Sequence, residues 1–226
     1  MKKWEQLPEF LQKEEIKPYY KALKSKGFSR FLKRAFDIFA SLVLIILLSP
    51  VMLVLAIMIK CDSSGPVFYK STRVTRYGED FKILKFRTMI TDADKKGALI
   101  TVSGDSRITK VGAKIRGSRL DEIPQLFNVF LGQMSFVGTR PEVRRYVDMY
   151  TPEMAATLLL PAGITSKASL TFRNEDEKMA ELTEKGLTVD EAYVNHILPE
   201  KMKMNLEYIE NFSFSEDIST CIKTVF

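Results

Sequence analysis

The uncharged stretch IFASLVLIILLSPVMLVLAIMI, Ile38–Ile59, decides the fold of this chain. A run of about 18 or more apolar residues is a candidate membrane helix, because about 20 residues span the hydrocarbon core of a bilayer. The stretch begins too far from Met1 for a usual secretory signal, and no clear cleavage site follows it. We therefore expect a retained membrane segment that covers residues 37–60.

The path of this segment through the membrane is left open by two features. Ser49-Pro50 lies at its centre, and proline removes a helical hydrogen bond and kinks a helix. Basic residues lie on both flanks, at Lys24, Lys26, Arg30, Lys33 and Arg34 before the segment and at Lys60, Lys70, Arg73 and Arg76 after it. A spanning helix normally has its lysines and arginines biased to the cytoplasmic side. From these residues alone, one spanning helix and a re-entrant helix broken at Ser49-Pro50 are equally good models. The second places both flanks at the same anionic leaflet.

The composition limits the classes of partner and metal site. With 226 residues the chain is long enough to bury a core. Its net charge of +6 and isoelectric point of about 9.2 suggest an anionic partner, which can be nucleic acid, anionic lipid or a phosphorylated substrate. Cys61 and Cys221 lie far apart and His196 is the sole histidine, so the sequence supports no disulfide framework, no zinc site and few histidine-based metal sites.

The remaining sequence predicts a mainly α fold with a small β-hairpin. Residues 1–36 mix aromatic residues, leucines and lysines at helical spacing, which fits an interfacial amphipathic extension or an extension packed on the main domain. Residues 61–226 form the expected main domain. Two short β-leaning runs between 61 and 90 predict the hairpin, and later patterns predict helices, one of them from Asp121 to Leu131.

Two adjacent acids, Asp121 and Glu122, stand out in SRLDEIPQLFN, Ser118–Asn128. Pro124 is acceptable only near the start of a helix, so both acids are expected at or just before the first turn. The positive end of the helix dipole there favours ionised carboxylates. One interpretation is an ordinary N-cap with a first-turn acid; the other is a nucleophile, metal ligand or base.

Basic residues in the middle third of the chain favour the second interpretation. They are Lys85, Arg87, Arg107, Arg116, Arg119 and Arg140, several of them in apolar or Gly/Pro-rich surroundings. Arginine pairs bidentately with phosphate oxygens, and Mg²⁺ suits carboxylates and phosphates. The pattern therefore indicates a site for a diphosphate bound through a divalent ion. Nucleic-acid binding would explain the charge but neither the membrane run nor the acid pair, and no P-loop, GxGxxG or GxSxG motif is present.

Several sequence blocks in a fixed order resemble the bacterial sugar transferases, the monotopic phosphoglycosyl transferases. The blocks are KRAFDIFAS, the Ser49-Pro50 pair, IKCDSSGPVFYK, FKILKFRTM, DSRITKVG, SRLDEIPQLFNVFLGQMSFVG, TRPE and PAGIT, over residues 33 to 175. The resemblance implies transfer of a phosphosugar from a UDP-sugar to a polyprenyl phosphate, usually undecaprenyl phosphate, with release of UMP. This would be the first membrane step of a surface glycan pathway, on the cytoplasmic face of the bacterial inner membrane, and a homodimer is reasonable for the family.

The resemblance also assigns roles to residues. It implies that Asp121 is the nucleophile of a covalent phosphosugar intermediate, assisted by Mg²⁺ at that aspartate, with Glu122 beside it. It implies a re-entrant helix broken at Ser49-Pro50. Arg140 and Pro141 match the family's nucleotide-binding Pro-Arg-Pro element, and Arg173-Asn174 match a phosphate contact.

This chain departs from the family pattern at three places. Thr75 stands where the family often has the first glycine of RxGxxG, and Thr139 stands where it has the first proline of Pro-Arg-Pro. SKASLTFRN, residues 166–174, replaces GWAQVNGRN, which bears on the sugar accepted. The additional membrane helices of larger members are not found, so a catalytic core with a short extension is expected. Two alternatives stay open: a glycosyltransferase that moves the sugar alone and releases UDP, and a basic membrane-surface scaffold without catalysis.

Overall fold

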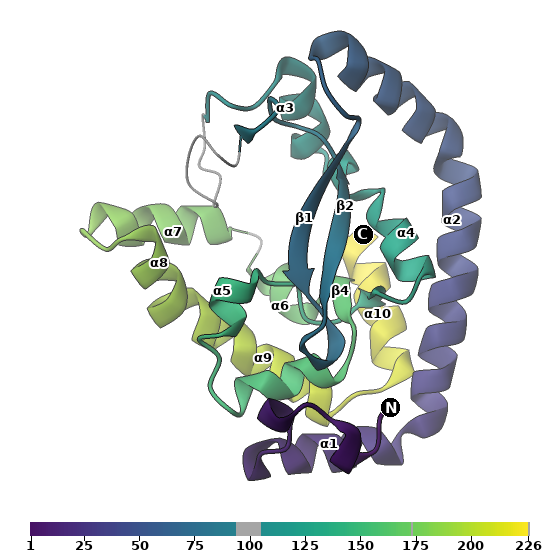
Figure 1. The fold of residues 1–226 in the computed structure, drawn as a ribbon, viewed down its shortest axis with the longest axis vertical. Helices are drawn as coiled ribbons and strands as arrows, with labels where there is room; N and C mark the ends of the chain where they lie inside the picture. The colour runs from purple at the N-terminus through teal and green to yellow at the C-terminus, as the bar shows by residue number, and fades with distance from the viewer. Residues whose placement is uncertain (94–104, 173, 226) are drawn as a thin grey trace.

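The long helix α2, Gly27–Asp62, curves along one side of the molecule in the computed structural model (Figure 1). The structure describes residues 1–93, 105–172 and 174–225. By length and composition α2 is able to cross a membrane, and only 11% of its most apolar window is buried. Its large apolar side chains instead face outward, for example Ile46, Leu47 and Leu53, each about two-thirds exposed. A core helix of a soluble protein buries such a surface, so this exposure supports a membrane-facing helix.

The helix α2 continues through Ser49 and Pro50, so the described residues show no interruption at this pair, where a break was expected. Pro50 has no N–H to donate to the carbonyl of Ile46, four residues earlier. The Ser49 hydroxyl donates to that carbonyl instead, with a distance of 2.8 Å between Oγ and O. The pair therefore permits a bend without leaving the Ile46 carbonyl unpaired. In lipid, an unpaired backbone carbonyl destabilises the structure by several kcal/mol. Re-entry into one leaflet stays a prediction.

Two small sheets lie beside α2. Strands β1, Phe68–Val74, and β2, Asp80–Phe86, form an antiparallel hairpin in which Phe68 pairs with Phe86, so the predicted hairpin is confirmed. Strands β3, Met134–Val137, and β4, Ala162–Thr165, form a parallel pair that was not predicted. Just beyond β3, the backbone at Gly138 lies very close to the segment that leads into β4. A Cβ on Gly138 would lie 2.5 Å from the Pro161 carbonyl oxygen. Only glycine fits there.

The remaining elements surround these sheets. The 3-10 turns are η1, Trp4–Gln6; η2, Glu9–Leu11; η3, Glu14–Ile16; η4, Arg76–Gly78; η6, Leu120–Glu122; and η7, Met154–Leu159. The helices are α1, Lys17–Ser25; α3, Lys110–Gly117; α4, Gln125–Phe130; α5, Arg144–Val147; α6, Lys167–Thr171; α7, Glu175–Glu184; α8, Val189–Ala192; α9, Leu198–Glu210; and α10, Phe214–Val225, with a π-turn η8 at Tyr193–Ile197. The fold is thus mainly helical, as expected, with two small sheets.

The N-terminal segment is part of the main core. Leu11, Ile16 and Leu23 are fully buried, and they belong to the same cluster as Leu159 and Phe212. Burying each such side chain contributes about 1.5–3 kcal/mol relative to leaving it exposed. The extension therefore packs on the main domain, and residues 27–36 are the first part of α2. An interfacial position of this segment stays a prediction.

Buried polar contacts tie α2 to the rest of the chain. The Lys33 Nζ atom donates to the Val137 carbonyl at 2.7 Å and to Asp217 Oδ2 at 2.8 Å. One turn further on, the Asp37 carboxylate accepts from the Ser135 hydroxyl at 3.0 Å and the Phe136 N–H at 3.1 Å. Since unpaired buried charges are costly, these contacts fix one position of α2 against β3 and α10.

Thr75 connects the hairpin to the second sheet. Its backbone is extended, so the glycine of the family pattern is not required at this position, and positive φ angles occur at Tyr77 and Gly78 instead. The Thr75 hydroxyl donates to the Gln133 carbonyl at 2.7 Å and accepts from the Ala162 N–H at 3.1 Å. The side chain that departs from the pattern therefore supplies a link between three segments.

We expect Thr75→Val to lower the free energy of unfolding by about 1–3 kcal/mol, because it leaves the Gln133 carbonyl and the Ala162 N–H without their partner. Thr72→Val, at an exposed position in β1, should change it by less than about 0.5 kcal/mol. Chemical unfolding in detergent measures both variants. Equal stabilities would contradict the proposed link.

Candidate active site

A large basic cleft opens beside the β-hairpin, with a volume of about 970 Å³. This is at the upper end of the range for small-molecule sites, about 300–1,000 Å³. Its cationic lining residues are Lys70, Arg73, Lys85, Arg87, Arg107, Arg116, Arg119 and Arg140. Its acidic lining residues are Asp92, Asp121, Glu122 and Glu175. The excess of guanidinium and ammonium groups suits a ligand with several phosphate oxygens.

The acid pair is presented by a tight turn ahead of α4. Arg119 has a left-handed backbone with φ of 54°, which turns the chain after α3. Leu120–Glu122 then form the 3-10 turn η6, and Pro124 is the N-cap residue of α4. The expected helix from Asp121 is therefore shorter than predicted, because α4 begins only at Gln125. The expectation that Pro124 marks a helix start with both acids before it is confirmed.

Glu122 is held by two cations. Its Oε1 atom accepts from Lys85 Nζ at 2.7 Å and from Arg140 Nη2 at 3.1 Å. Burial opposes ionisation of this carboxyl, but the charges of Arg140 and Lys85 outweigh it and lower the pKa of Glu122 to about 2. The pKa of Lys85 is also lowered, because burial is the largest influence on the ammonium and outweighs the charge of Glu122. We regard Glu122 as an anion at neutral pH, because it has two cationic partners.

Asp121 has a different environment from its neighbour. It lines the cleft and is 8% exposed. Within residues 1–93, 105–172 and 174–225, no side chain of another residue makes a hydrogen bond or ion pair to its carboxylate. Burial raises the pKa of Asp121, Lys85 and Arg116 oppose this, and the charge of Glu122 adds to it. The turn therefore presents one carboxylate locked in ion pairs and one that is available to a ligand.

The predicted basic residues divide into paired and open groups. The Arg87 guanidinium is buried and donates to the carbonyls of Ser63 and Ser64, so it ties the end of β2 to the end of α2. Arg107 pairs with Asp105. In contrast, Arg116 and Arg119 are exposed at the cleft, and in the part of the chain that the structure describes they make no side-chain hydrogen bond or ion pair. These two are the most available to phosphate.

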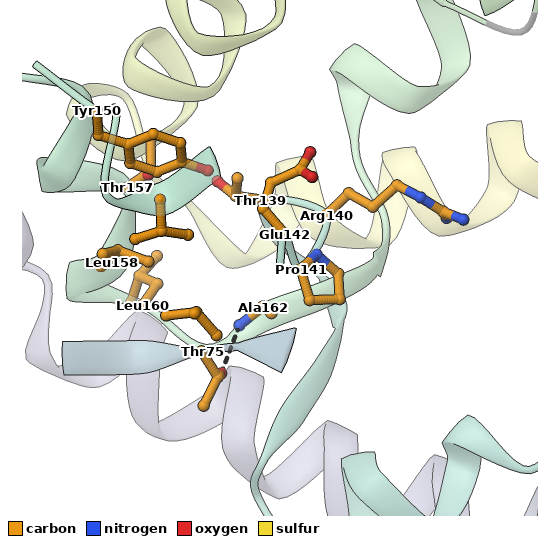
Figure 2. Close-up of a pocket in the computed structure, with 12 residues that line it drawn as sticks. Thr75, Thr139, Arg140, Pro141, Glu142, Tyr150, Thr157, Leu158, Leu160 and Ala162 are labelled. Carbon is orange, nitrogen blue, oxygen red and sulfur yellow. Dashed lines mark hydrogen bonds between the residues drawn. The ribbon is translucent and has the colours of Figure 1, made fainter. Parts of the chain in front are cut away.

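The Thr139-Arg140-Pro141 element lies at the edge of the cleft. Pro141 lines a separate pocket of only about 10 Å³, which is too small for a nucleotide (Figure 2). Figure 2 shows the Arg140 side chain extending away from the other residues of this pocket, and Arg140 also lines the large cleft. The backbone N–H of Gly163 donates to the Thr139 carbonyl at 2.9 Å, so β4 holds this position where the family has proline. Arg173 lies outside the described residues.

Sequence reasoning missed several residues that line the cleft. Tyr69, Ser71 and Arg73 come from β1, and Ser169, Phe172 and Glu175 come from the region of α6 and α7. The period-2 alternation of a strand places Tyr69, Ser71 and Arg73 on one face, and this signal was available in the sequence. The last three residues reach the cleft that Asp121 lines only through the tertiary fold.

A magnesium ion fits the available donors only in part. In the described ranges, no group of three or more His, Cys, Asp or Glu side chains lies close enough together to hold a metal ion. Mg²⁺ is nevertheless commonly bound by one or two carboxylates together with substrate phosphates and water. The available carboxylate of Asp121, in a cleft suited to phosphate, meets that requirement.

These features define a class of protein: one with an exposed apolar helix and a basic cleft arranged around one available carboxylate. A model of the family described as bacterial sugar transferase matches residues 28–226. The chain belongs to the bacterial sugar transferase family.

Curated relatives agree with this assignment. The chain is 35% identical over 198 residues to a protein of Aeromonas hydrophila named UDP-N-acetylgalactosamine-undecaprenyl-phosphate N-acetylgalactosaminephosphotransferase, covering 86% of this chain and 43% of that protein. It is 33% identical over 196 residues to a UDP-glucose:undecaprenyl-phosphate glucose-1-phosphate transferase of Caulobacter vibrioides, covering 85% and 68%. It is 32% identical over 204 residues to an Escherichia coli protein with the same name, covering 88% and 40%. The chain thus spans less than half of the first and third relatives.

We expect Glu122→Gln to destabilise the protein by about 3–5 kcal/mol, because the Lys85 ammonium and the Arg140 guanidinium lose the carboxylate to which both donate. The matched control is Glu79→Gln, which removes an exposed pair with Lys2 at 3.4 Å and should cost less than about 1 kcal/mol. Thermal unfolding of both variants tests this. A Glu122→Gln variant as stable as the native protein would show that Glu122 does not hold the two cations.

Proposed function

We propose that this protein transfers a phosphosugar from a UDP-sugar to a polyprenyl phosphate, such as undecaprenyl phosphate, and releases UMP. The observation that carries the proposal is the contrast between the two acids: Glu122 is locked by Lys85 and Arg140, whereas Asp121 faces a basic cleft with no partner among the described residues. The names of the relatives, which include undecaprenyl-phosphate transferases for N-acetylgalactosamine phosphate and glucose 1-phosphate, support the substrate classes.

The proposed reaction has two displacements at phosphorus. In the first, an Asp121 carboxylate oxygen forms a bond to the sugar-linked phosphorus, and the bond from that phosphorus to the oxygen of UMP breaks. In the second, a phosphate oxygen of the lipid attacks the same phosphorus, and the bond to Asp121 breaks. The products are the polyprenyl-diphosphate sugar and a regenerated Asp121. This is nucleophilic catalysis, which splits one difficult transfer into two easier steps.

The cleft stabilises the charge that moves in these steps. Arg116 and Arg119 are the open cations nearest in sequence to Asp121, and the charge of Arg116 already acts on the Asp121 carboxyl. Preorganised cations around transferring phosphoryl oxygens are usually the main catalytic contribution in phosphoryl transfer. Glu122 keeps Lys85 and Arg140 in place. If Mg²⁺ is bound, Asp121 and the diphosphate oxygens would hold it, and it would supply further neutralisation of phosphate charge.

The proposed location follows from the lipid substrate. A polyprenyl phosphate has its phosphate at the membrane surface, so the cleft must lie at that depth. We place α2 in one leaflet as a re-entrant helix, with the cleft on the cytoplasmic face of the bacterial inner membrane, where UDP-sugars are made. The outward apolar surface of α2, the proline inside this helix and its curved course support this placement (Figure 1).

Analysis of the released nucleotide tests the reaction class. With a UDP-sugar and undecaprenyl phosphate, we expect one UMP for each lipid-linked sugar diphosphate formed, because the attacked phosphorus is the one attached to the sugar. Chromatography separates UMP from UDP. Release of UDP would instead indicate a glycosyltransferase that moves the sugar alone, and no turnover with any UDP-sugar would favour a scaffold.

We expect Asp121→Asn to lower turnover by at least about 10³-fold with little change in stability, because the amide keeps the shape of the side chain but is not a nucleophile. The control is Asp148→Asn, at an exposed acid that does not line the cleft. An Asp121→Asn variant with full activity would exclude the covalent mechanism.

Cysteine labelling tests the path of α2. Cys61 is exposed at the C-terminal end of α2, and Ser25 is exposed just before its start. In a Cys221→Ser background, Cys61 reports one flank; with Cys61→Ser added, Ser25→Cys reports the other. In membrane vesicles of known orientation, we expect an impermeant maleimide to reach both from the same side. Labelling from opposite sides would show that α2 spans the membrane.

A further inference from the structure

Glu175 is one of the acidic residues that line the strongly basic cleft, and it lies far from the acid pair in sequence. It is the first residue of α7, and its side chain is 30% exposed. Ser169 and Phe172, from the segment just before it, line the same cleft and carry no charge. A carboxylate repels phosphate oxygens, so its presence here requires an explanation other than phosphate binding.

A buried lysine holds this carboxylate in place. Lys201 is 5% exposed, and its Nζ atom donates to Glu175 at 3.0 Å to Oε2 and 3.3 Å to Oε1. The same ammonium lies 3.5 Å from the Tyr193 hydroxyl. An ionised carboxylate has about four acceptor positions, so the contacts with Lys201 leave acceptor capacity on the side of Glu175 that faces the cleft. A fixed acceptor of this kind suits hydroxyl or amide N–H donors of a ligand.

Arg140 interacts both with Glu122 of the acid pair and with Glu175. Its guanidinium donates to Glu122 at 3.1 Å. Burial works against the charged form of Arg140, but the charges of Glu122, Glu142 and Glu175 outweigh it and raise the pKa of the guanidinium, so Glu175 lies within electrostatic reach of Arg140. Glu175 therefore acts on the same arginine that pairs with Glu122, and it lines the same cleft as Asp121. When the phosphates of a donor lie at Asp121, the neutral, hydroxyl-bearing part of that donor occupies the rest of the cleft, which Glu175 lines.

We infer that Glu175, held by Lys201, is a binding residue for the hydroxyl groups of the sugar nucleotide. The inference rests on the proposed function, since it requires a UDP-sugar in the cleft. The hydroxyl groups have two sources in such a donor, the transferred sugar and the ribose. UMP contains only the ribose, so comparing UMP with the UDP-sugar distinguishes the two.

The test measures binding as well as turnover in lipid nanodiscs, with UDP-glucose, UDP-N-acetylgalactosamine and UMP as ligands. Glu175→Gln alone leaves the buried Lys201 ammonium without its anion and can destabilise the fold. The double variant Glu175→Gln/Lys201→Met removes both charges and keeps the side-chain volumes similar. Glu200→Gln is the matched control, because Glu200 also ties α7 to α9, through Lys178 at 3.0 Å, but does not line the cleft.

We expect the double variant to bind the preferred UDP-sugar at least about tenfold more weakly, since a hydrogen bond to a charged acceptor is lost. Glu200→Gln should bind as the native protein does. If the double variant keeps the native affinity for UMP, the hydroxyl groups bound by Glu175 belong to the transferred sugar. If its affinity for UMP falls as much as that for the UDP-sugar, they belong to the ribose. A folded double variant with native affinity for all three ligands would overturn the inference while leaving the proposed function intact. A native protein that binds and turns over none of the UDP-sugars would overturn both.

Discussion

The ion pair between Lys33 and Asp217 is the interaction on which the rest of the arrangement depends. It places a charge of the apolar helix α2 in a buried position, where it must be paired, and so fixes α2 against α10. One residue further along α2, Arg34 donates to the carbonyls of Val129 and Phe130 at 2.7 and 2.8 Å, which satisfies the C-terminal end of α4. The opposite end of α4 follows the turn that carries the acid pair. The exposed apolar helix therefore also positions the site.

The site depends on Asp121 and Glu122, two adjacent acids, having different ion-pair partners. Like charges side by side oppose each other's ionisation, and the fold resolves this by giving Lys85 and Arg140 to Glu122. Asp121 receives no such partner from the described residues and stays available to a ligand. The same division runs through the basic residues, because Arg87 and Arg107 are engaged by neighbouring groups whereas Arg116 and Arg119 face the cleft. A cleft with some charges fixed and others available suits a ligand that brings its own negative charge.

Local rules were enough to predict several elements from the sequence. The uncharged run marked α2, two short β-leaning runs marked the hairpin, and Pro124 marked the start of α4. The parallel pairing of β3 with β4 was missed because it joins segments that are far apart in sequence, and its close approach at Gly138 has no local signature. The acid pair and the basic residues were identified as a group by residue type. Their division into paired and available side chains was not, because it depends on tertiary contacts such as that between Lys85 and Glu122.

The central claim is that Asp121 becomes covalently bonded to the phosphosugar, and mass spectrometry of the protein tests it most directly. The protein is incubated with its UDP-sugar in the absence of polyprenyl phosphate, quenched and digested. The account predicts that the peptide containing Asp121 gains the mass of one phosphosugar, that fragmentation places it on Asp121, and that adding polyprenyl phosphate before the quench removes it. Formation of UMP and lipid-linked product with no adduct on Asp121, or with the adduct on another residue, would contradict the account.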